Sequence, residues 1–329
     1  MSIELAPGIF RITTPLPFRP REVHAYLLEL AGGEWLLVDG GADLPEAWTA
    51  LDAGVTELAG GWDRVSRHFV THMHLDHIGL VGQVRKACRP ELLMGRLDAD
   101  RAAHAASQTQ EESEYRRSLL QSAGAPQEID GAMQKVIGGT SASSPFVTPD
   151  VLLPMETAPI PGAPGFSSVW TPGHTAGHTG IFRHSDRIFI GGDSVLPRVS
   201  ATIGVNRQRQ DPVADFLSSL EELTSLELTL ILPGHGEPLT QPQRRIDELA
   251  SETRGETAEI LRLVSDVPAT PWQIAKRRYP DRELPPALWM LAIRETLAHL
   301  HHLRDAGIIV ERKVANTLAS EFASWEEQT

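Results

Sequence analysis

The sequence is poor in the features that mark secreted and membrane proteins. Its 329 residues include a single cysteine, Cys88, so the chain can form no internal disulfide. No uninterrupted apolar run reaches the length of a transmembrane helix. The first residues lack the basic stretch followed by an apolar segment that defines a signal peptide. We therefore expect a protein of a reducing, cytoplasmic setting that does not enter a membrane. Cys88 lies outside every motif described below, and we expect it to be a buried apolar residue.

Basic residues are scarce in the first part of the chain. Residues 1–240 carry 18 Lys or Arg and 29 Asp or Glu, a net charge of −11, whereas residues 241–315 carry 12 and 11 and are nearly neutral. An acidic surface repels polyanions at long range. Bound metal ions would offset that charge locally, so the balance disfavours nucleic acid as a partner without excluding it.

Apolar runs between glycine-containing turns predict an α/β fold for residues 1–240. We expect a helix over residues 46–59 and a hairpin turn at Gly32-Gly33. The strands that we expect cover residues 9–12, 25–30, 35–38, 67–70, 168–170, 180–183, 187–190 and 228–232. Three of the later strands are followed closely by His or Asp in a turn with Gly. This pattern is expected when strands deliver ligands to one edge of a layered fold.

Two segments have helical character. Residues 97–136 are polar, Ala-rich at their start and almost free of Gly and Pro, and a loop is expected after them at 138–145. This insert is either a helical spacer or a lid over the active site. Beyond a boundary near residue 240, helices are expected over 243–265 and 286–305, with a shorter one from residue 272 and a strand or wing at 308–313. Residues 316–329, with three Glu and no basic residue, are expected to form an acidic tail.

Four potential metal ligands follow directly after the strand predicted at 67–70, in the run His72-Met73-His74-Leu75-Asp76-His77. Imidazole nitrogens and carboxylate oxygens suit zinc, iron or manganese, and a loop can turn such closely spaced groups around a pair of metals. The alternative, a chance group of polar residues in a surface turn, does not explain the apolar strand that precedes it. The set is completed by three later turns: Gly173-His174-Thr175-Ala176-Gly177-His178, Gly191-Gly192-Asp193 and Gly234-His235-Gly236.

These motifs together resemble those of the metallo-β-lactamase-fold hydrolase superfamily over about residues 1–240. The resemblance implies a four-layer αββα sandwich with two metals at one edge of its paired sheets. It implies that the first metal is held by His72, His74 and His174, and the second by Asp76, His77 and His235. Asp193 would bridge both. Antibiotic-destroying β-lactamases typically place Cys at the bridging position, so Asp193 indicates the glyoxalase II, lactonase and ribonuclease branches instead.

The resemblance also assigns two residues that support the metals. Asp39, in Val38-Asp39-Gly40-Gly41, matches the family's Asp-Thr-Gly turn with Gly in place of Thr. Its carboxylate would fix the orientation of a ligand, with a turn-capping Asp as the alternative. His178 stands where relatives have a His that supports the metal loop by hydrogen bonding, so it is not counted as a ligand. His24 stands where many relatives have Asn, and core packing is favoured for it.

The carboxy-terminal run His299-Leu300-His301-His302 invites an interpretation as a metal site. On a helix whose apolar face includes Leu300 and Leu303, however, the three histidines point to different sides and cannot converge on one ion. This helix, with Gly307 and the strand after it, resembles the winged-helix tail of the family of human lactamase-like protein two and its bacterial relatives. A role in packing on the hydrolase domain or forming its pocket is favoured. A homodimer contact and nucleic-acid binding through Lys276-Arg277-Arg278 are the alternatives.

The expected function is hydrolysis of a small ester, thioester or related acyl substrate at a binuclear centre, with two Zn²⁺ as the first choice and Fe or Mn as alternatives. Two divalent ions lower the pKa of a bridging water, and the hydroxide so formed attacks the substrate. Asp76 could orient that hydroxide and carry its proton to the leaving group. A metal-dependent endoribonuclease or phosphodiesterase is the first alternative, because the tailed relatives include ribonucleases. An iron-dependent persulfide dioxygenase is the second, although it would use fewer ligands than are present.

Overall fold

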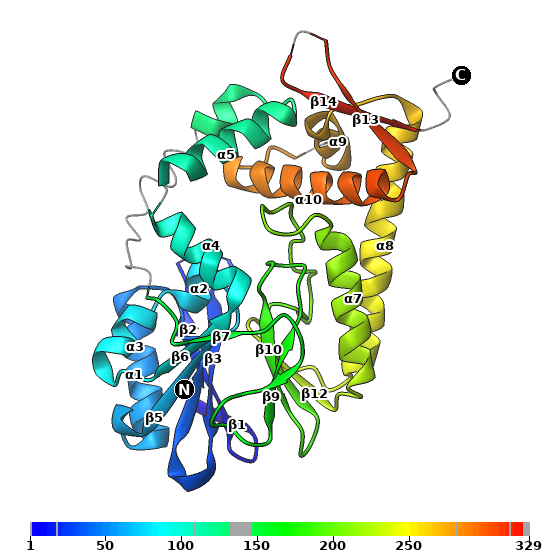
Figure 1. Cartoon of the computed structure of the whole chain (residues 1–329). Helices are drawn as coiled ribbons and strands as arrows, with labels where there is room; N and C mark the ends of the chain where they lie inside the picture. Colours follow the sequence, from blue (N-terminus) through cyan, green and yellow to red (C-terminus); the bar gives the residue numbers. More distant parts are fainter. Residues whose placement is uncertain are drawn as a thin grey trace. The chain divides into compact units, whose positions relative to one another are not determined.

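The computed structural model describes residues 2–17, 19–107, 109–131, 147–280, 282–315 and 317–324. Its helices and strands are drawn in Figure 1, which labels most of them. Contacts between Cα atoms divide the chain into two units built from non-consecutive segments. The first unit comprises residues 1–106, 142–201 and 219–247, and the second comprises residues 107–141, 202–218 and 248–329. The division at residue 240 that the sequence predicts stays a prediction about domain organisation.

The first unit contains a seven-stranded sheet whose strands follow the chain order. Along this order, the first three neighbouring pairs of strands are antiparallel and the last three pairs are parallel. The strands are β1 (Ser2–Ala6), β2 (Ile9–Pro15), β3 (Glu22–Glu29), β4 (Trp35–Val38), β5 (Val65–Val70), β6 (Glu91–Gly95) and β7 (Val151–Leu153). The predicted hairpin between β3 and β4 is confirmed. Its turn contains Gly32 and Gly33, whose φ angles of 78° and 76° favour glycine.

A five-stranded sheet packs against the first one. Its spatial order is β12-β11-β10-β9-β8, with β11 and β12 parallel and the other pairs antiparallel. The strands are β8 (Ala158–Pro159), β9 (Phe166–Trp170), β10 (Thr179–Arg183), β11 (Ile188–Gly192) and β12 (Leu230–Pro233). One core cluster contains Leu36 and Phe69 of the first sheet together with Ile181, Ile190 and Leu232 of the second. The two sheets therefore lie face to face.

Helices cover the outer faces of both sheets. On the first sheet, Leu51 and Val55 of α1 (Pro45–Ala59) and Val84 of α3 (Val81–Ala87) pack against Leu27 and Leu37. Beside the second sheet run the last half of α7 (Pro212–Ser225) and the first turns of α8 (Pro242–Asp266). Within the first unit, Ser219 of α7 donates a 2.7 Å hydrogen bond to the carbonyl of Pro172, just after β9. The layers are thus helix, sheet, sheet and helix, the αββα sandwich expected from the motifs.

The predicted insert is mostly helical in its described part, with a turn at residues 123–126. It contains α4 (Arg96–Ser107) and α5 (Thr109–Ser122), and α5 falls in the second unit. The loop predicted at 138–145 lies outside the described residues. Whether the insert acts as a lid stays a prediction. None of the helices in the described ranges is long and apolar enough to cross a membrane.

The second unit has the helices and hairpin of a winged-helix-like domain. These elements are most of α8 with α9 (Pro271–Arg278), α10 (Pro286–Asp305), β13 (Ile309–Lys313) and β14 (Ser320–Ser324), beside which the unit also contains α5 and residues 202–218. Ile260, Ile274, Leu300 and Phe322 share its core. Strand β14 lies within the segment predicted to be an acidic tail, because fully buried Phe322 anchors it beside β13. Residues 325–329 of that predicted tail lie outside the described residues.

Candidate metal centre

Four turns at the carboxyl ends of strands bring the seven predicted ligands together. The turn after β5 carries His72 and His74 and runs into the short helix α2 (Leu75–Ile78), which carries Asp76 and His77. The other three turns follow β9, β11 and β12 and carry His174, Asp193 and His235. Their donor atoms form three overlapping groups, each within 4.8 Å: His72 with His74 and His174, His72 with His77 and Asp193, and Asp76 with His77 and His235. We call these seven residues the metal cluster.

The first group consists of three imidazoles with their nitrogens turned inward. His74 Nδ1 lies 3.0 Å from His72 Nε2 and 3.0 Å from His174 Nε2. Burial and the neighbouring His174 together lower the pKa of His74 to about 3. Burial and the nearby imidazoles of His77 and His74 hold the pKa of His72 well below its usual range. Neutral imidazoles present free lone pairs, which is the form that binds a metal.

Asp193 lies between the histidines of the cluster. Its Oδ2 is 3.8 Å from His174 Nε2, 3.7 Å from His235 Nε2 and 4.0 Å from His72 Nε2, while its Oδ1 is 3.5 Å from His77 Nε2. Burial alone would raise the pKa of Asp193, but His77, His235 and His174 outweigh it and hold that pKa far below its usual range. The carboxylate is therefore charged and faces nitrogens on both sides.

Two histidines of the cluster, His72 and His235, are oriented by hydrogen bonds to residues outside it, so that the unprotonated Nε2 of each faces the other ligands. The Thr71 hydroxyl donates its hydrogen to Asp39 at 2.8 Å. His72 Nδ1, which lies 3.0 Å from the Thr71 oxygen, must therefore be the donor in that second hydrogen bond. His235 Nδ1 likewise donates to the carbonyl of Glu22 at 2.8 Å. With Nδ1 protonated, Nε2 is left as the ligand atom, as is usual for histidines that bind metals.

Asp39 lies at the centre of this supporting network. It is 2% exposed and has a φ of 56°, a left-handed conformation that Asp tolerates better than most residues. One oxygen accepts from the Thr71 amide and the other from His77 Nδ1, both at 2.8 Å. The Asp193 and Asp39 carboxylates raise the pKa of His77 well above its usual value, although burial alone would lower it. The geometry supports the predicted orienting role of Asp39, which we keep as a proposal.

Two buried atoms of the cluster have no hydrogen-bond partner. They are His77 Nε2 and Asp193 Oδ1, which face each other at 3.5 Å. Leaving buried polar atoms unpaired is costly, and a coordinated cation would satisfy both atoms. Together with the neutral imidazoles, this pair shows that the donor set fits divalent metal ions.

His178 supports the cluster without offering a free nitrogen. Its Nε2 accepts from the amide of Asp193 at 3.2 Å, and its Nδ1 donates to the Thr171 hydroxyl at 2.8 Å. Both ring nitrogens are therefore engaged with protein atoms. This arrangement agrees with a role in holding the Asp193 turn rather than in binding metal.

Three further histidines bond to residues outside the cluster. His24 bonds to Thr13 and to the carbonyl of Gly236, in keeping with the packing role favoured for it. His299 bonds to Thr257 and His302 to Asp211, so the carboxy-terminal histidines do not converge. Cys88 is partly buried beside the α1 core rather than fully buried, and burial raises its pKa to about 11.

Three residues that touch the ligand turns are not predicted from the sequence, namely Thr71, Asp98 and Thr175. Asp98 is fully buried and accepts hydrogen bonds from residues beside His74 and His174. No motif marks it, because its partners lie 25 to 79 residues away along the chain. Thr71 and Thr175 do adjoin predicted ligands, and that adjacency was the available signal.

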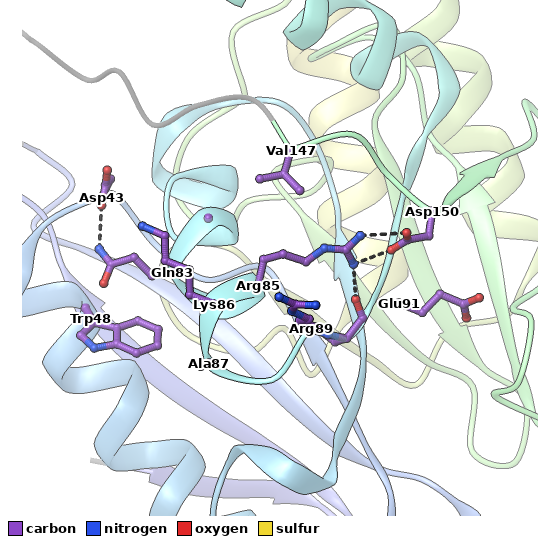
Figure 2. Close-up of a pocket in the computed structure, with 12 residues that line it drawn as sticks. Asp43, Trp48, Gln83, Arg85, Lys86, Ala87, Arg89, Glu91, Val147 and Asp150 are labelled. Carbon is purple, nitrogen blue, oxygen red and sulfur yellow. Dashed lines mark hydrogen bonds and ion pairs between the residues drawn. The ribbon is translucent and has the colours of Figure 1, made fainter.

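A pocket of about 1440 Å³ lies beside α3, apart from these ligands (Figure 2). No residue of the metal cluster lines it. Its Arg85 pairs with both oxygens of Asp150, and Asp43 accepts a 2.7 Å hydrogen bond from Gln83. Two pairs of side chains in this pocket thus bond to each other, and the predicted metal-binding donors lie in the cluster.

Comparisons with known proteins agree with the fold. The chain is 26% identical over 320 residues to the "Probable metallo-hydrolase YqjP" of Bacillus subtilis, covering 94% of this chain and 96% of that protein. It is 22% identical over 309 residues to the "Beta-lactamase-like protein 2 homolog" of Caenorhabditis elegans, covering 93% and 87%. The "Atrochrysone carboxyl ACP thioesterase" of Aspergillus fumigatus is 26% identical over 262 residues, covering 79% and 66%.

A solved structure and a family model extend the agreement. The crystal structure of a metallo-beta-lactamase family protein from Thermus thermophilus matches with a TM-score of 0.82 and 26% identity, covering 98% of this chain and all of that one. The model of the metallo-beta-lactamase superfamily matches residues 18–235, a span that includes all seven residues of the metal cluster. Since this match covers more than half of the sequence, the chain belongs to the metallo-beta-lactamase superfamily.

Proposed function

We propose that the protein is a binuclear metal-dependent hydrolase of small ester or thioester substrates. His72, His74 and His174 would hold one divalent ion, Asp76, His77 and His235 a second, and Asp193 both. The observation that carries the proposal is that His77 Nε2 and Asp193 Oδ1 are buried 3.5 Å apart and that neither has a hydrogen-bond partner. Two bound divalent ions would supply a water made acidic enough to act as a nucleophile near neutral pH and would polarise the substrate oxygen.

The residues of the chain divide the remaining work. Thr71 and Glu22 fix the protonated nitrogens of His72 and His235, so that each ligand is already oriented before substrate arrives. Asp76 Oδ2 lies 3.3 Å from His235 Nε2, and this imidazole holds the pKa of Asp76 below its usual value in spite of burial. Asp76 thus remains a carboxylate that can accept a proton and pass it to the leaving group.

The choice of substrate class rests on charge and on relatives. The acidic first part of the chain disfavours RNA, and one relative bears the name of a thioesterase. The persulfide dioxygenase alternative would leave His77 and His235 without a role, although both face Asp193 within the cluster. We take Zn²⁺ as the first metal to test, with Mn and Fe as alternatives. A cytoplasmic location and the oligomeric state stay predictions.

The test is an activity panel on zinc- or manganese-loaded protein. The panel contains aryl esters, acyl thioesters, lactones, a phosphodiester and single-stranded RNA. We expect ester or thioester turnover that falls by at least about 100-fold in His72→Ala and in Asp193→Ala, as loss of a metal ligand requires. His184→Ala is the matched control, since this histidine lies outside the cluster and bonds to Ser167.

Two outcomes would overturn the proposal. One is the absence of any ester or thioester hydrolysis that depends on His72 and Asp193. The other is metal-dependent cleavage confined to RNA or the phosphodiester, which would establish the phosphodiesterase alternative instead.

A further inference from the structure

We infer that Asp98 is a positioning residue that ties two ligand turns of the metal cluster together. The turns are residues 72–74, which carry His72 and His74, and residues 174–177, which begin with His174. This inference rests on the proposed metal binding and adds a residue that neither the motifs nor the donor set include.

One carboxylate contacts both turns. Asp98 Oδ2 accepts from the backbone amide of Met73 at 2.9 Å and from the hydroxyl of Thr175 at 2.7 Å, and Oδ1 accepts from the amide of Gly177 at 2.6 Å. Met73 lies between two of the histidines, and Thr175 directly follows the third. Because the side chain is fully buried, no water competes for these bonds.

The chain is shaped to bring Asp98 this close. Asp98 is the third residue of α4, which follows directly after Gly95 at the end of β6. A Cβ at Gly95 would lie 2.0 Å from the carbonyl oxygen of Gly177, and a Cβ at Gly177 would lie 2.2 Å from the backbone nitrogen of Asp98. Only glycine allows this approach at both positions, so the contact between the start of α4 and the second turn is specific.

We call the three hydrogen bonds by which Asp98 joins the two turns the clamp. The clamp requires a carboxylate rather than any polar side chain. All three partners are donors, so Asp98 must accept on both of its oxygens. An amide offers one accepting oxygen and one donating nitrogen, and the nitrogen would face either Gly177 or the pair Met73 and Thr175. Asp98→Asn therefore loosens one turn relative to the other while keeping the size of the side chain.

The consequence lies in the spacing of the three imidazoles. His74 Nδ1 is 3.0 Å from nitrogens of both His72 and His174, although His174 is 100 residues away along the chain. That spacing depends on how the two turns joined by Asp98 are placed relative to each other. We expect a shift of one turn against the other to weaken metal binding by about 10- to 100-fold, the usual effect of losing a group that orients metal ligands.

The experiment measures Zn²⁺ affinity and stoichiometry by competition with a chromophoric chelator, together with the denaturant midpoint. Asp98→Asn is compared with Asp100→Asn, an exposed carboxylate two residues further along α4. Thr175→Val and Thr175→Ser form a second pair, which removes or keeps one of the three bonds. We expect about 10- to 100-fold weaker Zn²⁺ binding in Asp98→Asn and a smaller loss in Thr175→Val. Asp100→Asn and Thr175→Ser should bind as wild type does.

The readouts separate a clamp from a merely structural role. A lower denaturant midpoint with wild-type Zn²⁺ affinity in folded Asp98→Asn would overturn the inference. If Asp98→Asn does not fold, equal Zn²⁺ affinities in Thr175→Val and Thr175→Ser would overturn it equally. Wild-type protein that binds no Zn²⁺ would instead overturn the proposed function, a result that is distinct from failure of the clamp.

Discussion

Each unit of the protein contains a group of histidine and acidic side chains, and the two groups neutralise their charge differently. In the second unit Arg278, 5% exposed, lies 3.4 Å from Glu259, 3.5 Å from Glu295 and 3.8 Å from Glu256, while His299 lies 3.4 Å from Glu256. We call these five residues the arginine cluster. Here a guanidinium from the chain itself balances the carboxylates.

The metal cluster contains no such cation. Among the described residues, neither Asp76 nor Asp193 pairs with a Lys or Arg, and both face imidazoles instead. Buried carboxylates require a compensating charge. Composition alone therefore does not define a metal site. What distinguishes the metal cluster is that its donor atoms converge and that no Lys or Arg among the described residues pairs with its carboxylates.

The largest expected effect is the loss of stability on metal removal, which should depend on the metal cluster and not on the arginine cluster. Because a bound ion stabilises only the folded state, saturation at about 1,000 times Kd raises the free energy of unfolding by roughly 4 kcal/mol. We expect thermal unfolding of zinc-loaded protein to occur at a clearly higher temperature than that of chelator-treated protein. Asp193→Ala should lose most of this difference. An equal zinc-dependent shift in Asp193→Ala would show that the ion binds elsewhere.

Removing the guanidinium should destabilise the protein without touching metal binding. Arg278→Met leaves three carboxylates without their shared partner. Because the Glu256 and Glu259 side chains are 32% and 41% exposed, we expect the free energy of unfolding to fall by about 1–2 kcal/mol, less than for a fully buried pair. Arg277→Met is the control, since Arg277 is exposed and its loss should cost less than about 0.5 kcal/mol. Denaturant unfolding measures both. If Arg278→Met is as stable as wild type, or if it loses bound zinc, the statement that the two clusters neutralise their charge differently is contradicted.

The smallest expected effect is a pH dependence that arises in the arginine cluster. Burial and the nearby Glu256 raise the pKa of Glu295 from 4.5 to about 7, against the lowering effect of Arg278. The folded state therefore binds more protons than the unfolded state between about pH 4.5 and 7, so the contribution of Glu295 to stability is full below that window and declines as pH rises through it.

Glu295→Gln should abolish this decline. At pH 8 we expect the variant to be more stable than wild type by an amount of the order of 1–2 kcal/mol, and the difference should shrink toward pH 4.5. Glu283→Gln, at an exposed position, is the control. Denaturant unfolding at a series of pH values provides the measurement. A constant difference across the series would contradict the assignment.

Much of the first unit could be predicted because each ligand turn follows an apolar strand. The strands expected at 67–70, 168–170 and 187–190 lie within or overlap β5, β9 and β11, and their turns deliver ligands to one edge. The seven ligands could be named because turns with this order and spacing resemble a known family. Periodicity was also available for α7, whose Val213, Phe216, Leu220 and Leu223 are buried at helical spacing, although no element was predicted there.

Other features depend on contacts between distant parts of the chain. The role of Asp98 appears only when β6 and the turn after β9 meet, and the left-handed conformation of Asp39 only when Thr71 and His77 surround it. Strand β14 is held by β13 and by the burial of Phe322, and its five residues contain too little pattern to separate it from a charged tail. Local sequence reports propensity, whereas these features are set by tertiary packing.

The central claim is that the metal cluster binds two divalent ions. The direct test is a count of tightly bound metal per chain after stripping, reloading with zinc and removal of excess ion, by elemental analysis against protein concentration. The account predicts two ions per chain in wild type and in Arg278→Met, and fewer than two in Asp193→Ala. One ion or none in the wild-type protein would contradict it.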